Sequence, residues 1–305
     1  GVCRGKFGCL NLRDDSMDLF SRLILHSLDG IVYGWLYALI AFGLSLIFGF
    51  LNIVNVAHGA LYMLGAVFGW YIAAELSGGN FWLALLLAPL MVCALSMVFE
   101  TVVLRPIGDN ADMSILSTFG AMLIIENVVL GWIGGQGVTF DPPFHGKIPI
   151  LRYSYSTYRL FVMGSAMVVT AGLWAFLQKT KYGLWIRAVR MNTDLSLADG
   201  IPVKSVNTLA FGLGGLLAGL SGVLAGPFIA IFPTMGLNVL IIAFIVVIVG
   251  GLGDMFGAVV AGLMLGYVEN VMSIFVEPTY AKVIALLFVT TFLFFRPNGL
   301  FGRGR

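Results

Sequence analysis

The sequence predicts an all-α fold, a polytopic integral membrane protein built as a helical bundle with about eight to ten transmembrane helices. Of its 305 residues, 59% are hydrophobic and only 10% are charged, against roughly 45–50% and 25% in an ordinary soluble domain. The charges are also unevenly spread, because four stretches contain no Asp, Glu, Lys or Arg: residues 30–74, 76–99, 160–178 and 205–253. Such runs are typical of chains that cross the hydrocarbon core of a bilayer.

The two longest uncharged runs each have to fold back within the membrane. About 20 helical residues cross a bilayer core, whereas the last run would form a helix roughly 75 Å long. Turn signals divide that run at Gly226-Pro227 and near Pro233, and they divide the first run near Asn52 to Gly59, since proline lacks an amide donor and glycine permits turns. The sequence thus predicts nine helices, with eight or ten still compatible with it, at about residues 28–50, 59–76, 81–104, 113–134, 158–178, 205–226, 237–252, 256–275 and 281–296.

Glycines spaced four residues apart recur within the predicted helices. In lipid, apolar surfaces gain little by meeting each other, so close backbone approach through small residues becomes a main source of helix association. We therefore predict tight helix packing at these positions, and helices that pack this way can also rock between two arrangements. The pairs are Gly30 and Gly34, Gly65 and Gly69, Gly215 and Gly219, Gly222 and Gly226, and Gly262 and Gly266.

The chain divides into a polar N-terminal tail, residues 1–16, and a single transmembrane domain, residues 17–305. The tail differs in composition from everything after it, and Met17 directly precedes the first apolar segment. We therefore expect the tail to be a non-native remnant or an overlong start. The most polar stretch of the domain is the loop 179–204, which carries five basic residues: Lys179, Lys181, Arg187, Arg190 and Lys204.

The distribution of these basic residues predicts which side of the membrane each loop faces. The positive-inside rule places the loop 179–204 in the cytoplasm, together with the C-terminus, which carries Arg296, Arg303 and Arg305. Four predicted spans separate the two regions, and an even number is consistent with both facing the same side. Nine spans would then place the N-terminus outside, although its own basic residues argue for the opposite.

The sequence gives no support for an enzyme or for a nucleic-acid-binding protein. A net charge of +2 is too small for a basic binding face. Ser221 and Asp254 match short patterns of intramembrane proteases, but no histidine follows His145 to act as a base. The only candidate for a second aspartate is Asp29, which lies at a membrane edge. The chain has neither H-E-x-x-H nor a phosphate-binding G-x-x-x-x-G-K-[ST] motif. We therefore expect no catalytic residues, no metal and no cofactor.

Polar residues within apolar segments mark candidate positions of a transport pathway. Unpaired polar groups are costly in hydrocarbon, and intramembrane ionisable residues are functional candidates by default. Such residues can also have a structural role, capping broken helices or pairing within the bundle, and the sequence leaves both interpretations open. The candidates are Asn52, Asn55 and His58 between the first two spans, Glu126 with Asn127, and Glu269 with Asn270.

The loop 179–204 contains the signals of a short capped helix. Asn192-Thr193-Asp194 supplies N-cap chemistry, Gly200 suits the position after the helix end, and Pro202 prevents its continuation. A short helix with apolar residues that projects from a membrane bundle is typical of a docking surface. The alternative is a plain surface connection.

Four groups of residues in this chain resemble the LivH-type permeases of branched-chain amino acid ABC importers. The similarity runs in the same order from about Met17 to Gly302, and residues 1–16 have no counterpart. Two positions depart from the pattern of the family, namely Asp199 and Asp254. The groups are Asn55-Val56-Ala57-His58-Gly59 followed by Leu61-Tyr62-Met63-Leu64-Gly65, Gly183-Leu184-Trp185-Ile186-Arg187-Ala188-Val189 leading to Ala198-Asp199-Gly200-Ile201, Gly250-Gly251-Leu252-Gly253 with Gly257-Ala258, and Arg296-Pro297-Asn298-Gly299-Leu300-Phe301-Gly302.

This resemblance implies a set of partners and a second group of functional residues. In such importers two related permease subunits form the pathway, two cytoplasmic subunits bind ATP, and a periplasmic binding protein delivers the substrate. The chain would lie in the bacterial inner membrane, surrounded by lipid. The loop 179–204 would couple it to the ATPase through Arg187, Ala188, Asp194, Ala198, Asp199 and Gly200.

The resemblance therefore predicts a permease subunit that moves leucine, isoleucine or valine inward by alternating access, driven by ATP hydrolysis in a partner chain. Permeases of urea or short amides are related, and they remain an alternative. A stand-alone secondary transporter or channel is a second alternative, which would show flux without any ATPase.

Overall fold

The computed structural model describes residues 12–51, 54–76, 78–108, 110–150, 153–296 and 299–300. Most of the predicted tail lies outside these residues, as does Asn52. The first helix, α1 (Leu12–Leu51), passes without a break through the predicted boundary at Met17. The assignment of residues 1–16 as a separate tail therefore stays a prediction.

The described chain is mostly helical, and every predicted span contains a helix. Eight helical segments are long and apolar enough to cross a membrane, while a further apolar helix, α10, has only 16 residues. The long helices after α1 are α2 (His58–Trp70) with the π-helix η1 (Tyr71–Leu76), α3 (Phe81–Phe99) with the π-helix η2 (Glu100–Leu104) and α4 (Arg105–Ile107), α5 (Ala111–Ile133), α6 (Thr157–Lys179), α9 (Val203–Ala225), α10 (Met235–Gly250), α11 (Met255–Met272) and α12 (Pro278–Phe295).

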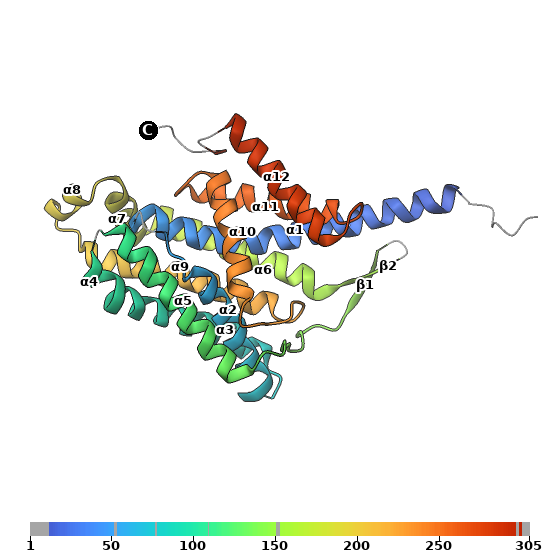
Figure 1. The fold of residues 1–305 in the computed structure, drawn as a ribbon, viewed down its shortest axis with the longest axis horizontal. Coiled ribbons are helices and arrows are strands. Elements are labelled where there is room, and N and C mark those ends of the chain that lie inside the picture. The colour runs from blue at the N-terminus through green and yellow to red at the C-terminus, as the bar shows by residue number, and fades with distance from the viewer. Residues whose placement is uncertain are drawn as a thin grey trace, which may run out of the picture.

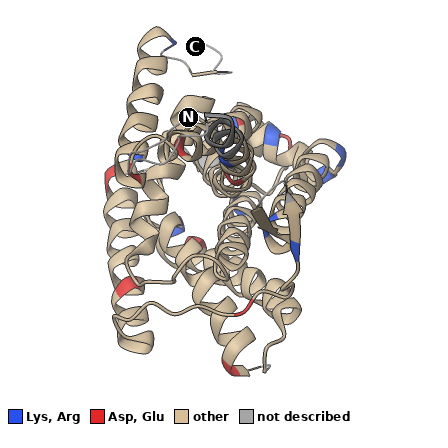
Figure 2. Ribbon diagram, turned by 90° about the vertical axis from the view of Figure 1, so that its right-hand side faces the viewer, with Lys and Arg blue, Asp and Glu red and all other residues tan. Residues whose placement is uncertain are grey.

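The short elements lie at the two opposite ends of the bundle. Helices α7 (Lys181–Met191) and α8 (Thr193–Ala198) lie at one end, and an antiparallel hairpin of β1 (Lys147–Ile150) and β2 (Tyr153–Ser156) lies at the other (Figure 1). We call these the α8 end and the hairpin end. Figure 2 looks along the helices from the hairpin end and shows that charged residues are sparse over the bundle.

Side-chain caps fix where several of these helices begin. The Asn80 side chain accepts hydrogen bonds from the backbone amides of Trp82 and Leu83, at 3.1 and 3.3 Å, at the start of α3. Asn110 caps α5 in the same way. Asp254 accepts a hydrogen bond of 2.7 Å from the Gly257 amide and so caps the start of α11. Each cap satisfies amides that have no partner within the helix.

Glycines bring the inner helices into backbone contact, as the sequence predicted. A Cβ atom added at Gly65 of α2 would lie 2.2 Å from the carbonyl oxygen of Gly219 in α9. In the same way, a Cβ atom added at Gly266 of α11 would lie 2.4 Å from the backbone nitrogen of Gly34 in α1. Both distances are shorter than a van der Waals contact, so only glycine permits these approaches.

The bundle has a buried interior and an apolar outer face. Helices α1, α2 and α9 are largely buried by the other helices, whereas α5, α6 and α12 keep most of their surface exposed. The exposed side chains of these outer helices are mainly apolar, such as Leu116, Val168 and Phe294. A soluble protein rarely exposes such a surface, so we interpret it as the surface that contacts lipid.

Replacing Gly65 with Ala should therefore destabilise the bundle, because the added methyl group forces α2 and α9 apart. Overpacking of this kind costs about 1–3 kcal/mol, so the midpoint of thermal unfolding in detergent should fall by at least about 3 °C. Gly172→Ala in α6 is the matched control, since nothing lies within 4 Å of a Cβ atom there. Equal midpoints for the two variants would contradict the proposed packing.

Candidate functional site: a cavity, a broken helix and a projecting loop

The chain between α1 and α2 returns deep into the bundle before α2 begins. The ring nitrogen Nε2 of His58, the first residue of α2, donates a hydrogen bond of 3.1 Å to the carbonyl oxygen of Ile40. Ile40 lies roughly 16 Å before the end of α1, at 1.5 Å per helical residue. The residues just before His58 are not helical. Non-helical backbone at this depth is tolerated only where it is buried in protein or lines a cavity.

This break carries polar atoms without partners. Asn55 and His58 both have 0% of their surface exposed. Both polar atoms of the Asn55 side chain and Nδ1 of His58 make no hydrogen bond, while the backbone amide of Val56 donates to the Thr118 hydroxyl of α5 at 3.2 Å. Buried groups of this kind usually bind water or a ligand. Asn55 and His58 thus interrupt the apolar bundle, and their role in a transport pathway stays a prediction.

A cavity of about 500 Å³ lies between α1, α2, α9 and the last three long helices, and we call it the central cavity. Its wall combines two kinds of side chain. Leu36, Ile40, Val239 and Ile242 are aliphatic, whereas the tyrosines and the remaining polar residues offer hydroxyl, amide and charged groups. This polar set consists of Tyr33, Tyr37, Tyr62, Ser221, Asn238, Glu269, Asn270, Ser273 and Lys282.

Glu269 and Asn270, two of the predicted pathway residues, both line the central cavity. The Tyr37 hydroxyl donates a hydrogen bond of 3.0 Å to Oε2 of Glu269 and thereby joins α1 to α11. The Asn270 amide group donates to the carbonyl oxygen of Gly266 in its own helix, at 2.9 Å. Both side chains are partly buried. The cavity therefore contains a carboxylate that is held in place by a neighbouring helix.

A second, more polar cavity of about 600 Å³ adjoins the central cavity near the hairpin. Ser273 lines both cavities. In the second cavity Arg159 forms an ion pair with Asp29, and the Tyr155 hydroxyl donates to Asp29 at 2.8 Å. Burial raises the pKa of Tyr155, and the Asp29 carboxylate raises it further, so Tyr155 keeps its proton at neutral pH. We call this space the hairpin-end cavity.

Glu126 and Asn127 lie away from both cavities, on α5. The Asn127 side chain is exposed on the outer face of the helix and donates to the carbonyl oxygen of Leu123 at 2.8 Å. Glu126 is partly buried, and its Oε1 atom has no hydrogen-bond partner. The predicted pathway residues that the structure describes thus fall into three separate places: the break before α2, helix α5 and the wall of the central cavity.

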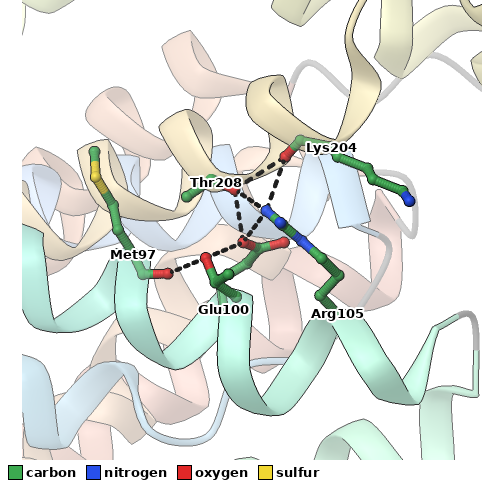
Figure 3. Close-up of polar contacts among 6 residues, drawn as sticks. Met97, Glu100, Arg105, Lys204 and Thr208 are labelled. Carbon is green, nitrogen blue, oxygen red and sulfur yellow. Dashed lines mark hydrogen bonds and ion pairs between the residues drawn. The ribbon is translucent and has the colours of Figure 1, made fainter.

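A polar cluster near the α8 end escaped the sequence analysis. Glu100 is only 4% exposed and forms a 3.1 Å ion pair with Arg105 (Figure 3). The Thr208 hydroxyl of α9 donates to the same carboxylate oxygen at 2.7 Å, and Arg105 also reaches the carbonyl oxygen of Lys204 at 3.4 Å. A signal was present, since Glu100 is the one acidic residue between residues 76 and 108 and precedes Arg105 by five positions. The cluster connects the end of α3 to the start of α9.

The loop 179–204 forms the short capped helix that its sequence predicted. The Asn192 side chain accepts a hydrogen bond of 3.0 Å from the Leu195 amide, and Gly200 has a φ of 76°, which ends α8. Every residue of α8 except Ser196 is exposed. Asp194, Ala198, Asp199 and Gly200 therefore lie on a projecting surface, as expected.

Arg187 and Ala188, the remaining predicted coupling residues, lie on α7 and are partly buried. The Arg187 guanidinium donates to the carbonyl oxygen of Leu177 at 2.8 Å and to the side chain of Gln178 at 2.6 Å. It thus closes the end of α6 against α7. The coupling role of these residues stays a prediction.

The comparison with protein families identifies this bundle. The family model described as "Branched-chain amino acid transport system / permease component" matches residues 27–293. The chain belongs to this family. The resemblance found in the sequence is therefore confirmed, and so is the expectation that the chain is a transport subunit and not an enzyme.

Individual relatives span most of this permease. The high-affinity branched-chain amino acid transport system permease protein LivH of Escherichia coli is 26% identical over 93% of this chain and 97% of its own length. BraD of Pseudomonas aeruginosa, which has the same description, is 29% identical over 90% and 94%. The ribose import permease protein RbsC of Escherichia coli is 24% identical over 81% and 77%. No solved structure matches the chain significantly.

The ion pair between Glu100 and Arg105 leads to a testable prediction about the stability of the permease. Arg105→Met leaves the buried Glu100 carboxylate with only the hydroxyls of Thr101 and Thr208 as partners. This should reduce stability by about 1–3 kcal/mol, because a buried charge without its ion-pair partner is penalised. Adding Glu100→Gln to this variant should restore part of the loss, because the amide carries no charge. The measurement is the thermal unfolding midpoint of both variants and of the Glu100→Gln single variant. Strictly additive losses would contradict the ion pair.

Proposed function

We propose that this permease is the membrane subunit of a bacterial ABC importer and moves branched-chain amino acids inward across the inner membrane. The observation that carries the proposal is the contrast between the two ends of the bundle. Cavities with polar walls begin near the hairpin, while an exposed capped helix projects from the opposite end. A substrate would enter at the first end, and a motor protein would act on the second.

The proposed orientation places the α8 end in the cytoplasm and the hairpin end in the periplasm. Five basic residues of the loop 179–204 lie at the α8 end, consistent with the positive-inside rule. If the chain crosses the membrane nine times, with α10 as the shortest pass, the start of α1 and the end of α12 lie on opposite sides of the membrane. A periplasmic binding protein would then deliver its substrate to the hairpin-end cavity.

We propose α8 as the contact with a cytoplasmic ATP-binding subunit. Leu195 and Leu197 are 63% and 57% exposed, and Met191 just before them is 88% exposed. A partner that covers these apolar side chains removes them from water, and this favours binding. Two ATP-binding subunits and a second, related permease subunit would complete the importer.

Glycine packing gives a physical basis for alternating access. The contacts between α1 and α11 and between α2 and α9 include direct backbone approaches at glycines. Such helices can rock against one another with little repacking. The cluster of Glu100, Arg105 and Thr208 joins α3 to α9 directly beyond the loop that carries α8, so a push on α8 would reach these two helices first.

We propose that the pathway includes the central cavity, where Glu269 and Asn270 would face the substrate. The pathway role of Asn55, His58, Glu126 and Asn127 stays a prediction, because these side chains lie outside that cavity. LivH and BraD are described as branched-chain amino acid permeases, and these descriptions support leucine, isoleucine and valine as the proposed substrates of this chain. A ribose permease is also among the relatives, so similarity by itself does not identify the substrate, and the substrate must be tested directly.

Reconstitution tests the proposed function. Liposomes that contain this permease, its partner permease and the ATPase should accumulate leucine only with ATP and the binding protein. Flux through the permease alone would support a stand-alone transporter instead. Accumulation of urea or a short amide in place of leucine would support the other alternative.

The docking role of α8 predicts the effect of changes on its exposed surface. Leu197→Asp and Ala198→Trp should each reduce ATP-driven uptake by at least about tenfold, because they disturb a packed interface, and less ATPase should co-purify with the permease. Leu76→Asp is the control, since Leu76 is 68% exposed but lies at the end of η1, far from α8 along the chain. Normal uptake with bound ATPase in both α8 variants would exclude α8 as the contact.

A further inference from the structure

We infer that the central cavity binds an amino-acid zwitterion, with Glu269 facing its ammonium group, Lys282 facing its carboxylate, and aliphatic residues facing an apolar side chain. This inference rests on the proposed function and adds a binding site and a reason for selectivity within the permease itself.

The central cavity contains one charge of each sign. Among its described lining residues, Glu269 on α11 is the one acidic residue and Lys282 on α12 the one basic residue. A charged side chain in a membrane bundle is costly and usually pairs with another. Glu269 is partly buried and Lys282 is exposed at the edge of the cavity, and the two form no ion pair with each other. Lys282 has no hydrogen-bond or ion-pair partner among the described residues. Opposite charges that share a cavity without pairing leave space for a ligand with two charges.

Tyr37 positions the carboxylate of Glu269 for such a ligand. Its hydroxyl donates to Oε2 at 3.0 Å, so one carboxylate oxygen is occupied by α1. The other oxygen has no partner among the described residues and can accept a hydrogen bond from an ammonium group. A charged acceptor and a charged donor form stronger hydrogen bonds than neutral groups do.

The rest of the wall fits a branched apolar side chain. Leu36 and Ile40 on α1 and Val239 and Ile242 on α10 give four aliphatic residues from two facing helices. The volume of about 500 Å³ lies in the range of small-molecule sites. A polar substrate such as a sugar would leave hydroxyl groups unsatisfied against these side chains, and that loss discriminates strongly against it.

The entrance of the cavity is also suited to a charged molecule. The hairpin-end cavity contains Asp29 paired with Arg159, and it meets the central cavity at Ser273. The Ser273 hydroxyl lies 3.3 Å from Nδ1 of His26 and donates to the carbonyl oxygen of Asn270 at 2.6 Å. Polar groups of Ser273, His26 and Asn270 therefore lie where the two cavities adjoin, and a zwitterion that enters from the hairpin end would meet them.

The test compares leucine with two analogues, each of which lacks one charge of the zwitterion. Leucinamide has no carboxylate, and 4-methylpentanoate has no ammonium group. Binding of each ligand to the purified permease in detergent is measured by saturation-transfer NMR, so the selectivity of the binding protein does not enter. Wild-type permease should bind leucine at least about tenfold more tightly than either analogue.

Each charged residue should account for discrimination against one analogue. Lys282→Gln should remove the preference for leucine over leucinamide and leave the preference over 4-methylpentanoate. Glu269→Gln should do the opposite. Lys282→Arg should keep both preferences, because it keeps the charge. Glu75→Gln and Lys147→Gln, which change charges outside the cavity, should behave as wild type.

Leucine uptake by the reconstituted importer separates this inference from the proposed function. Lys282→Gln and Glu269→Gln should reduce uptake at least about tenfold, while stimulation of the ATPase by the binding protein shows that the variants are folded and assembled. If wild-type importer takes up no leucine, the proposed function is wrong. If it does, but both variants keep wild-type uptake and the same preferences among the three ligands, the zwitterion site is wrong.

Discussion

Close contact between glycine-bearing helices is the interaction on which the rest of this structure depends. Within a bilayer, burial of apolar side chains gives little drive for helices to associate, so packing distance becomes decisive. Gly65 against Gly219 and Gly34 against Gly266 bring α2 to α9 and α1 to α11 at backbone distance. These four helices form the frame on which the outer, lipid-facing helices lie. Bulky side chains such as Leu39, Met63 and Leu217 are buried around these glycine contacts and fill the rest of the interior.

Two helices that begin inside the bundle, α2 and α10, help to form the central cavity. Helix α2 begins beside Ile40, in the interior, and α10 has only 16 residues. Gly59 and Gly236, which lie one residue after the starts of these two helices, are in backbone contact. Two helices that begin at a common depth leave room beside α1. The central cavity lies next to α1 and α10, and its aliphatic wall comes from these two helices.

The predicted functional residues separate into groups with different physical roles. Glu269 belongs to the cavity, held by Tyr37 of another helix, whereas Asn55 and His58 lie in a closed interior with unpartnered atoms. Arg187 closes the end of α6, while its neighbours on α8 project outward. The division suits a transport subunit, in which one end recognises a substrate, the other contacts a motor, and buried polar groups between them connect moving helices.

The sequence by itself determined the membrane character, the nine helices within a few residues at most ends, the capped helix α8 and the family. These features follow from local composition and spacing, because uncharged runs, glycine and proline breaks and Asn192 act on neighbouring residues. The sequence did not show that Glu100 joins Thr208, that Glu126 lies away from Glu269, or that Lys282 shares a cavity with Glu269. Those relations connect residues far apart in the chain, and the rotation and depth of each helix decide them. Helix rotation and depth are set by contacts such as Gly65 with Gly219, which exist only after the bundle has packed.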